Sequence, residues 1–262
     1  MKNRDRKIVV AGCFSWVLML AALFFLILAI REYAPFYLND RKMEQLQKDV
    51  APIKKTEEKK KMVKKIPGWA SREIDWKKLH KINPDIIAWI QVPETKIDYP
   101  VLRCHTWNEY LHKDYKGNKA YLGSVFIQSE NAPNFRDFDT IIYGHNMRNK
   151  SMFGSLHKYE KKSFWKKHRV IYLYQPDKAI RYRIYAAYDC KDGSETFQTE
   201  FKDDAAKKEW ILLTRKLSYY TAKDKIRPDD FILTLSTCSN GGPRSSRYVV
   251  HSIKKEMIEF DK

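Results

Sequence analysis

The feature that most constrains this chain is a run of 23 residues without a charged side chain, from Ile8 to Ile30. In a bilayer such a run is accommodated as a helix, because every backbone polar group needs an internal hydrogen bond. Its length is sufficient to cross a hydrocarbon core about 30 Å thick. Basic residues precede it, and a basic flank stays in the cytoplasm. We expect a cytoplasmic tail at 1–7, an uncleaved transmembrane signal anchor at 8–30, and the remaining chain outside the membrane.

The alternative for this run is a cleaved signal peptide. The apolar core of such a peptide spans roughly 7 to 15 residues, which is shorter than the run observed, and a small-residue cleavage site follows it. No A-x-A-like site follows Ile30. The lysines further along the chain do not oppose an outward orientation, since long domains translocate largely regardless of charge.

Residues 31–68 are rich in charge and contain the run KKTEEKKKMVKK, from Lys54 to Lys65. We interpret this region as a solvated, partly helical stalk that ends at Pro67 and Gly68; the alternative is a patch that touches an anionic envelope polymer. The net charge of +18 would also suit a nucleic-acid-binding protein. We expect no nucleic-acid partner, because the basic charge lies outside the membrane.

Residues 69–262 are expected to form one extracellular domain with many short strands. Ile74–Ile82 has helical spacing, and Asp85 can cap a further helical turn in the segment DIIAWI. A long amphipathic helix is predicted at 203–220. Strands are predicted within 90–102, which reads as strand, turn, strand, and at 121–128, 139–144, 169–174, 179–188, 229–238 and 247–253. About seven or eight closely spaced strands predict a mainly β fold with a closed or nearly closed barrel.

The C-terminal segment FILTLSTCSNGGPRSSRYVV places a cysteine at the end of a strand, followed by a loop with Gly and Pro. If the two strands pair as a hairpin, Cys238 and Arg247 lie side by side. A fixed positive charge favours the thiolate and can also hold a developing oxyanion. Two alternatives stay open: Cys238 can be a buried core residue, and Arg244 in the loop competes with Arg247.

A nucleophilic cysteine also needs a group that gives a proton to the leaving amine. Among the seven histidines, His145 differs because it follows the apolar strand DTIIYG. The other six lie among charged residues or in predicted helices and loops, and we expect them at the solvated surface: His80, His105, His112, His157, His168 and His251.

The four cysteines contain no C-x-x-C pair and no zinc-type spacing. A Cys104–Cys190 bridge stays open at this stage. We expect no metal and no cofactor, since there is no acidic cluster and no Gly-rich phosphate loop.

Taken together, TLSTC, the following R-x-V-V and the upstream YGHNM resemble the sortase family. The finer features resemble class B: NPDIIAWIQVPETKIDYPV, GSVFI, MFGSLHKY after YGHNM, and a long helix before the TLSTC strand. The resemblance covers roughly residues 69 to 255. It implies a sortase-type closed barrel of about eight strands, with N-terminal helices and the long helix inserted before the catalytic strand.

The resemblance also implies a membrane-anchored cysteine transpeptidase with His145, Cys238 and Arg247 as its catalytic residues. Ser236, Thr237 and Asn146 are then candidates for substrate binding. The implied partners are surface proteins with a C-terminal sorting signal, LPxTG-like or NPxTN-like and cleaved after Thr, and an amine of lipid II or the peptidoglycan cross-bridge, in a Gram-positive cell envelope.

Three other functions stay open, and a fourth is set aside. A pilin-polymerising sortase would use a pilin lysine as acceptor, and a cysteine protease would only hydrolyse its substrate. A non-enzymatic envelope-binding protein would have an inert Cys238. An L,D-transpeptidase also uses Cys and His, but its nucleophile motif does not resemble TLSTC.

Overall fold

The structure is a computed structural model that describes residues 2–51, 66–239 and 245–260. The charged run 54–65 and the rival Arg244 lie outside the described residues. The chain divides into two compact units, Met1–Glu44 and Gln45–Lys262. Helix α1 (Lys2–Val50) forms the first unit, and its last residues belong to the second.

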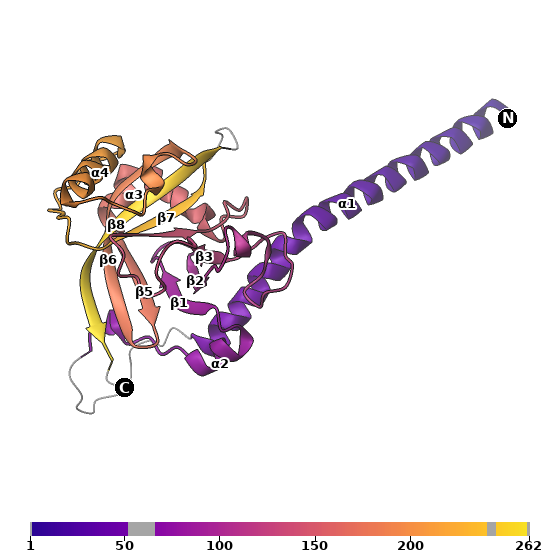
Figure 1. The fold of residues 1–262 in the computed structure, drawn as a ribbon. Coiled ribbons are helices and arrows are strands. Elements are labelled where there is room, and N and C mark those ends of the chain that lie inside the picture. Colours follow the sequence, from indigo (N-terminus) through magenta and orange to yellow (C-terminus); the bar gives the residue numbers. More distant parts are fainter. Residues whose placement is uncertain (1, 52–65, 240–244, 261–262) are drawn as a thin grey trace. The chain divides into compact units, whose positions relative to one another are not determined.

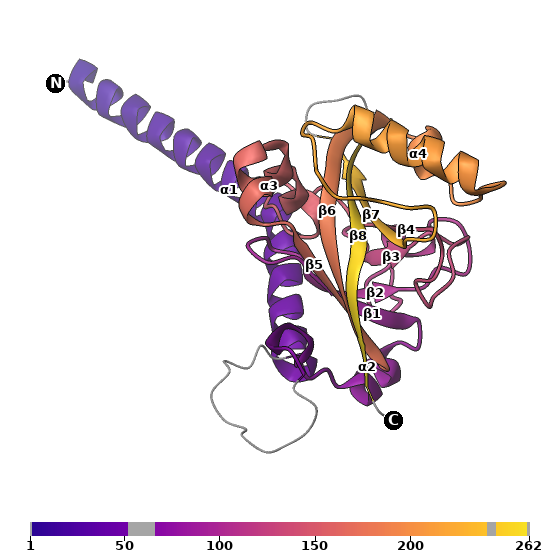
Figure 2. The ribbon, with the colours of Figure 1, turned by 90° about the vertical axis from the view of Figure 1, so that its left-hand side faces the viewer.

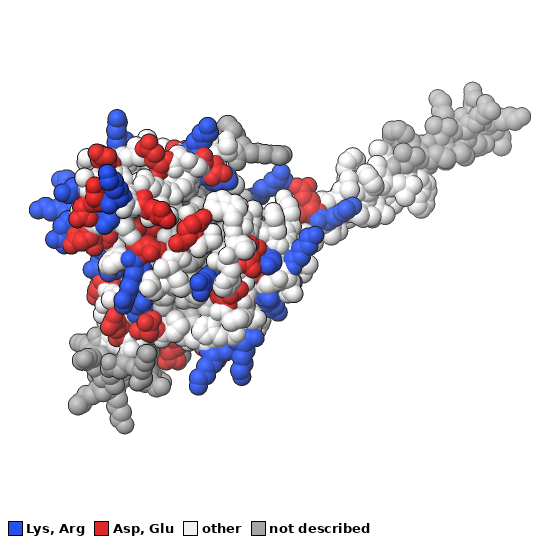
Figure 3. Space-filling view, viewed as in Figure 1, with Lys and Arg blue, Asp and Glu red and all other residues white. Residues whose placement is uncertain are grey.

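In the first unit, helix α1 carries exposed apolar side chains from Leu18 to Ile30, which appear as a white stretch in Figure 3. The segment Leu18–Val50 has an apolar window with a mean hydropathy of 1.8 and is long enough to cross a membrane. The helix therefore has the length and composition that a membrane span requires.

The second unit is built around a closed barrel with the strand order β1-β2-β3-β4-β7-β8-β6-β5 (Figures 1 and 2). Its strands are β1 (Ile86–Gln91), β2 (Asp98–Leu102), β3 (Val125–Ile127), β4 (Asp139–Tyr143), β5 (Val170–Gln175), β6 (Lys178–Lys191), β7 (Ile232–Cys238) and β8 (Ser246–Glu259). Neighbouring strands are antiparallel except in the β2–β3 and β4–β7 pairs. The predicted mainly β closed barrel is confirmed.

Short helices surround this barrel. They are α2 (Trp76–Ile82), α3 (Lys162–Lys167), α4 (Asp204–Leu217) and the 3-10 helices η1 (Gly68–Ala70), η2 (Glu109–His112), η3 (Phe153–Glu160) and η4 (Glu195–Phe197). Helix α4 is the long helix expected between β6 and β7. Asp203 caps it by accepting a hydrogen bond from Ala206 N at 2.9 Å. Thr214 of α4 reaches the hydroxyl of Tyr185 in β6 at 3.1 Å, so the helix is fixed to the barrel wall.

Two local predictions were wrong. The segment 86–91 is strand β1 and not a helical turn, and its residues Ala88, Trp89 and Ile90 are buried. A continuous apolar run fits a buried helix and a buried strand equally well, and pairing with β2 and β5 decides for the strand here. The strand expected at 121–128 is only Val125–Ile127, since Gly123 has a left-handed φ of +55° that interrupts the extended backbone.

A chain of buried polar groups crosses the barrel interior beneath β7. Thr234 Oγ1 donates to Asp139 Oδ1 at 2.6 Å and lies 2.8 Å from His251 Nδ1. His251 Nε2 lies 2.9 Å from the Tyr188 hydroxyl. Burial lowers the pKa of His251 to about 3. The neutral ring therefore donates from Nδ1 and accepts at Nε2, which satisfies every contact in the chain.

Asp139 ends this chain, and burial raises its pKa well above the usual range. Its Oδ2 has no partner among the described residues. The folded protein therefore holds a proton that an unfolded chain releases above about pH 4. Stability from this carboxyl is present at low pH and is lost as pH rises towards the raised pKa, by up to about 1.4 kcal/mol per pH unit.

Asp139→Asn keeps the shape of the protonated carboxyl without its titration. We expect the free energy of unfolding of the variant, relative to the unchanged protein, to grow between about pH 4 and about pH 8. Denaturant unfolding of the full-length chain in detergent at both pH values measures this difference. A difference that is independent of pH would mean that Asp139 is not protonated in the fold.

Candidate active site

The cysteine and the arginine meet as the hairpin prediction requires. Strands β7 and β8 pair antiparallel, with Cys238 opposite Arg247. Arg247 Nη1 lies 3.8 Å from Cys238 Sγ, and Nη2 donates to Asp192 Oδ2 at 2.7 Å. Cys238 is exposed, whereas the six β7 residues before it are buried. Arg247 therefore presents a guanidinium to an accessible sulfur, while Asp192 fixes its orientation.

His145 follows strand β4, which lies next to β7 in the barrel. Its Nε2 lies 2.9 Å from Leu111 O. A carbonyl oxygen only accepts, so Nε2 carries a proton and Nδ1 is the nitrogen that can exchange one. Burial lowers the pKa of His145, and the charge of His112 acts in the same direction. The neutral imidazole is therefore favoured.

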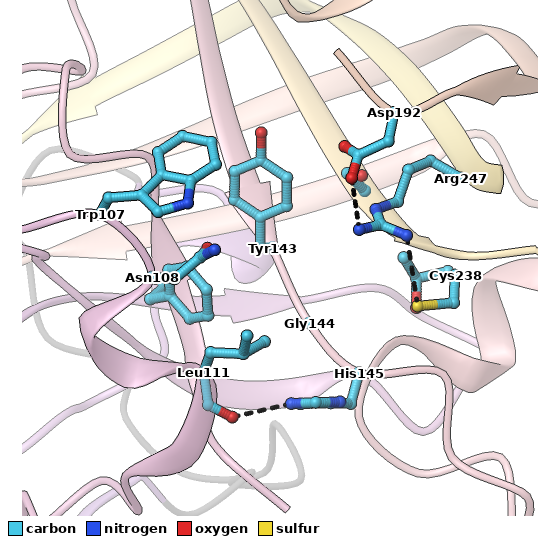
Figure 4. Close-up of a pocket in the computed structure, with 12 residues that line it drawn as sticks. Trp107, Asn108, Leu111, Tyr143, Gly144, His145, Asp192, Cys238 and Arg247 are labelled. Atoms are coloured by element: carbon cyan, nitrogen blue, oxygen red, sulfur yellow. Dashed lines mark hydrogen bonds and ion pairs between the residues drawn. The ribbon is translucent and has the colours of Figure 1, made fainter. Parts of the chain in front are cut away.

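A cavity of about 110 Å³ joins the three candidates, and Figure 4 shows Cys238 between Arg247 and His145. Sequence reasoning missed most of its other lining residues, because they come from loops and strand ends: Trp107, Asn108, Leu111, Phe126, Tyr143, Gly144 and Asp192. Trp107, Tyr143 and Asp192 also line an adjoining hollow of about 670 Å³. Of these seven residues, Asp192 is the one that the sequence could have indicated, because it lies directly after β6 and before a glycine.

The three predicted substrate-binding residues lie in different surroundings. Ser236 and Thr237 are buried and line the cavity. Neither hydroxyl oxygen has a hydrogen-bond partner among the described residues. Asn146 donates from Nδ2 to Cys238 O at 2.9 Å, so its amide lies on the main chain of the cysteine. A role for these three in substrate binding stays a prediction.

Two histidines do not lie at the solvated surface, contrary to expectation. His157 is 7% exposed and His251 is fully buried. His251 lies in the middle of an apolar strand. Side chains alternate between the two faces of a strand, and the face that carries His251 is buried. His157 lies on η3, and its Nε2 contacts Cys238 O at 3.0 Å. Its spacing of three residues to Glu160 was the available signal, since the two side chains pair.

Two further cysteines, Cys104 and Cys190, do not belong to this site. Cys104 and Cys190 are free, so the bridge that was left open does not form in this structure. Burial raises the pKa of each thiol to about 11. Cys190 lies opposite Arg247 on strand β6, on the side away from Cys238.

Gly123 supports the histidine. A Cβ at this position would lie 2.3 Å from Leu111 O and 3.0 Å from His145 Nε2. Gly123→Ala would therefore displace the carbonyl that holds His145. We expect the free energy of unfolding to fall by about 3 kcal/mol or more, and kcat to fall with it.

Gly117→Ala is the matched control for this change, because Gly117 also has a positive φ but its Cβ would meet only Asn83 Nδ2 at 4.0 Å. This variant should lose about 1 kcal/mol from the left-handed backbone alone. Thermal unfolding and peptide kinetics of both full-length variants make the comparison. Equal losses would show that the contact with Leu111 does not matter.

The comparisons with known proteins agree with this geometry. The family model of the Sortase domain matches residues 90–254, more than half of the chain. Sortase B of Listeria monocytogenes is 36% identical over 160 residues, which cover 61% of this chain and 65% of that protein, just under two thirds of its length. The chain therefore belongs to the sortase family, whose fold it shares.

Solved structures place it within that family. Sortase B from Bacillus anthracis in complex with AAEK1 has a TM-score of 0.70 at 27% identity, covering 85% of this chain and 98% of that chain. The Staphylococcus aureus sortase B–substrate complex has a TM-score of 0.63 at 29% identity, covering 71% and 85%. The chain is a class B sortase, as its motifs predicted.

Proposed function

We propose that this protein is a membrane-anchored cysteine transpeptidase that attaches surface proteins to the cell wall. It cleaves a C-terminal sorting signal, LPxTG-like or NPxTN-like, after Thr. It then transfers the new carboxyl end to an amine of the peptidoglycan precursor. The observation that carries this proposal is the meeting of Cys238, Arg247 and His145 at one cavity, from three neighbouring strands.

In the first half-reaction, the Cys238 thiolate attacks the carbonyl carbon of the signal's threonine. A C–S bond forms, and the carbonyl oxygen becomes an oxyanion. Arg247 lies close enough to the sulfur to donate a hydrogen bond to this oxygen. The bond to the next residue's nitrogen then breaks. The leaving amine takes its proton from the His145 imidazolium, and a thioester remains on Cys238.

In the second half-reaction, an amine enters and gives a proton to the neutral His145 imidazole. Its nitrogen attacks the thioester carbon, the C–S bond breaks, and the Cys238 thiolate returns with an amide as the product. The lowered pKa of His145 favours the form that accepts this proton. The imidazolium needed for the first half-reaction is correspondingly scarce, so the active pair is a minority protonation state.

The cleft beside Cys238 provides a place for the signal peptide. The cavity at Cys238 continues past Trp107, Tyr143 and Asp192 into the adjoining hollow. We place the residues next to the scissile bond at the cavity and the rest of the signal along this hollow. Ser236 and Thr237 line the cavity and are the candidates to contact the peptide there.

Anchoring follows from helix α1. Its apolar part has the length of a membrane span, and the basic residues before it favour a cytoplasmic N-terminus, which leaves the catalytic domain outside. Cell-surface labelling or protease treatment of intact cells tests this orientation. A catalytic domain that is protected until the membrane is permeabilised would contradict it.

The activity is tested on the full-length chain in detergent with a panel of fluorogenic sorting-signal peptides and hydroxylamine. Cleavage after Thr with hydroxamate as product supports a thioester-forming transpeptidase, and the best peptide identifies the signal. Free acid alone, whatever amine is added, would favour a cysteine protease instead. Adding a peptidoglycan-type amine and a pilin-type lysine peptide in parallel separates the two acceptor classes.

A further inference from the structure

Strand β7 ends at Cys238 without a neighbour on one side. On the β4 side, Tyr143 pairs with Ser236, and Gly144 N donates to Ser236 O at 3.1 Å. Carbonyl groups two residues apart in a strand point the same way, so Cys238 O also points towards β4. Strand β4 has already ended at Tyr143. Among the described residues, the main-chain ladder therefore offers no donor to the carbonyl of Cys238.

Two side chains contact the Cys238 carbonyl in place of a main-chain donor. Asn146 donates to Cys238 O at 2.9 Å, and His157 Nε2 contacts the same oxygen at 3.0 Å. Asn146 comes directly after His145, whereas His157 comes from η3. The carbonyl of the cysteine is thereby tied to the segment that carries His145 and to a helix outside the barrel.

The contacts of His157 also fix the orientation of its ring. Nε2 donates to Cys238 O, because a carbonyl oxygen only accepts. Nδ1 lies 2.6 Å from Glu160 Oε1. The ring also stacks on Tyr248, with centroids 4.6 Å apart at 27°. Three contacts thus hold the ring next to the main chain of Cys238.

We propose that His157 is a positioning residue for Cys238: its ring, oriented by Glu160, fixes the Cys238 carbonyl and thereby the direction of the thiol. This inference rests on the proposed role of Cys238 as nucleophile. The last residue of a strand next to a loop has few other restraints, and the donor sets the ψ angle of Cys238.

The test compares His157→Leu with His157→Gln in the full-length chain in detergent. Leucine fills the buried site without a donor, whereas the Gln Nε2 can replace the donor. We expect His157→Leu to lower kcat about tenfold with KM within about twofold. Glutamine should recover a large part of the loss. Glu160→Gln should fall between, because the ring stays but loses its carboxylate.

The matched control is His80→Leu. His80, on α2, also contacts a main-chain carbonyl through Nε2, that of Ile86 at 3.0 Å. This carbonyl does not belong to the cysteine strand. This variant should keep its kcat. A kcat that is unchanged in His157→Leu, or that falls equally in His80→Leu or is not recovered by glutamine, would overturn the inference.

A second readout separates this inference from the proposed function. Iodoacetamide reacts with the Cys238 thiolate whether or not any peptide is processed. Slower alkylation in His157→Leu than in the unchanged protein supports the positioning role even if no peptide in the panel is cleaved. Equal alkylation rates would contradict that role even if the transpeptidase activity is fully established.

Discussion

Replacing Cys238 by alanine is expected to lower hydroxamate formation from the best signal peptide by at least about a thousandfold. The thioester cannot form without the sulfur, and no other described cysteine lies at the cavity. Folding should be unaffected, because Cys238 is exposed and its backbone contacts remain. Product release by mass spectrometry and thermal unfolding of the full-length chain measure both quantities.

Cys190→Ala is the matched control for this experiment. Cys190 and Cys238 both pair with Arg247, from strands on opposite sides of β8. Burial raises the pKa of Cys190 to about 11, so its thiol stays protonated near neutral pH. We expect near-normal activity. Substantial hydroxamate formation by Cys238→Ala would leave a different nucleophile as the better account.

Replacing His145 by glutamine should lower kcat by about a hundredfold to a thousandfold, the contribution expected of one general acid–base group. The glutamine amide can still donate to Leu111 O, which His145 Nε2 contacts at 2.9 Å. The variant therefore keeps the hydrogen bond that positions the side chain and loses only proton transfer, since an amide does not exchange a proton in this pH range. Single-turnover and steady-state kinetics should both show the loss, with KM nearly unchanged.

His112→Gln serves as the control for this prediction. The His112 ring centroid lies 6.2 Å from that of His145, and its charge lowers the pKa of His145. Removing it should raise that pKa, shift the limb of the pH–rate profile that reports His145 to higher pH, and change the maximal rate by less than about threefold. If His145→Gln kept most of its activity with the profile unchanged, another group would have to move the proton.

The barrel was predictable because the length of each strand and the spacing of the turns can be recognised in short stretches of the sequence. The hairpin at Cys238 needed only two apolar runs and a Gly-rich loop. The segment 86–91 was not predictable in the same way, because its apolar residues fit a helix or a strand and only pairing with β2 and β5 decides. Gly123 shortened another strand through a backbone angle that sequence periodicity does not reveal.

The candidate site was predictable only in part, for a related reason. Cys238, Arg247 and His145 each lie at or within two residues of a strand end, which is a recognisable position. Asp192 and His157 act through partners that are distant in the sequence, Arg247 and the Cys238 carbonyl. Such contacts exist only after the barrel has closed. The glycine after Asp192 and the spacing of His157 to Glu160 mark these residues in the sequence, but neither mark indicates the distant partner.

The strand order has a consequence for biogenesis. His145 follows β4, whereas Cys238 and Arg247 come from β7 and β8, which follow every other strand in the chain. Strand β8 pairs with both β6 and β7 and closes the barrel. A nascent chain that has emerged only as far as β6 holds the histidine without sulfur or guanidinium. Under the proposed mechanism, a chain that ends at β6 can therefore form no thioester, and the enzyme becomes competent only when β7 and β8 are in place.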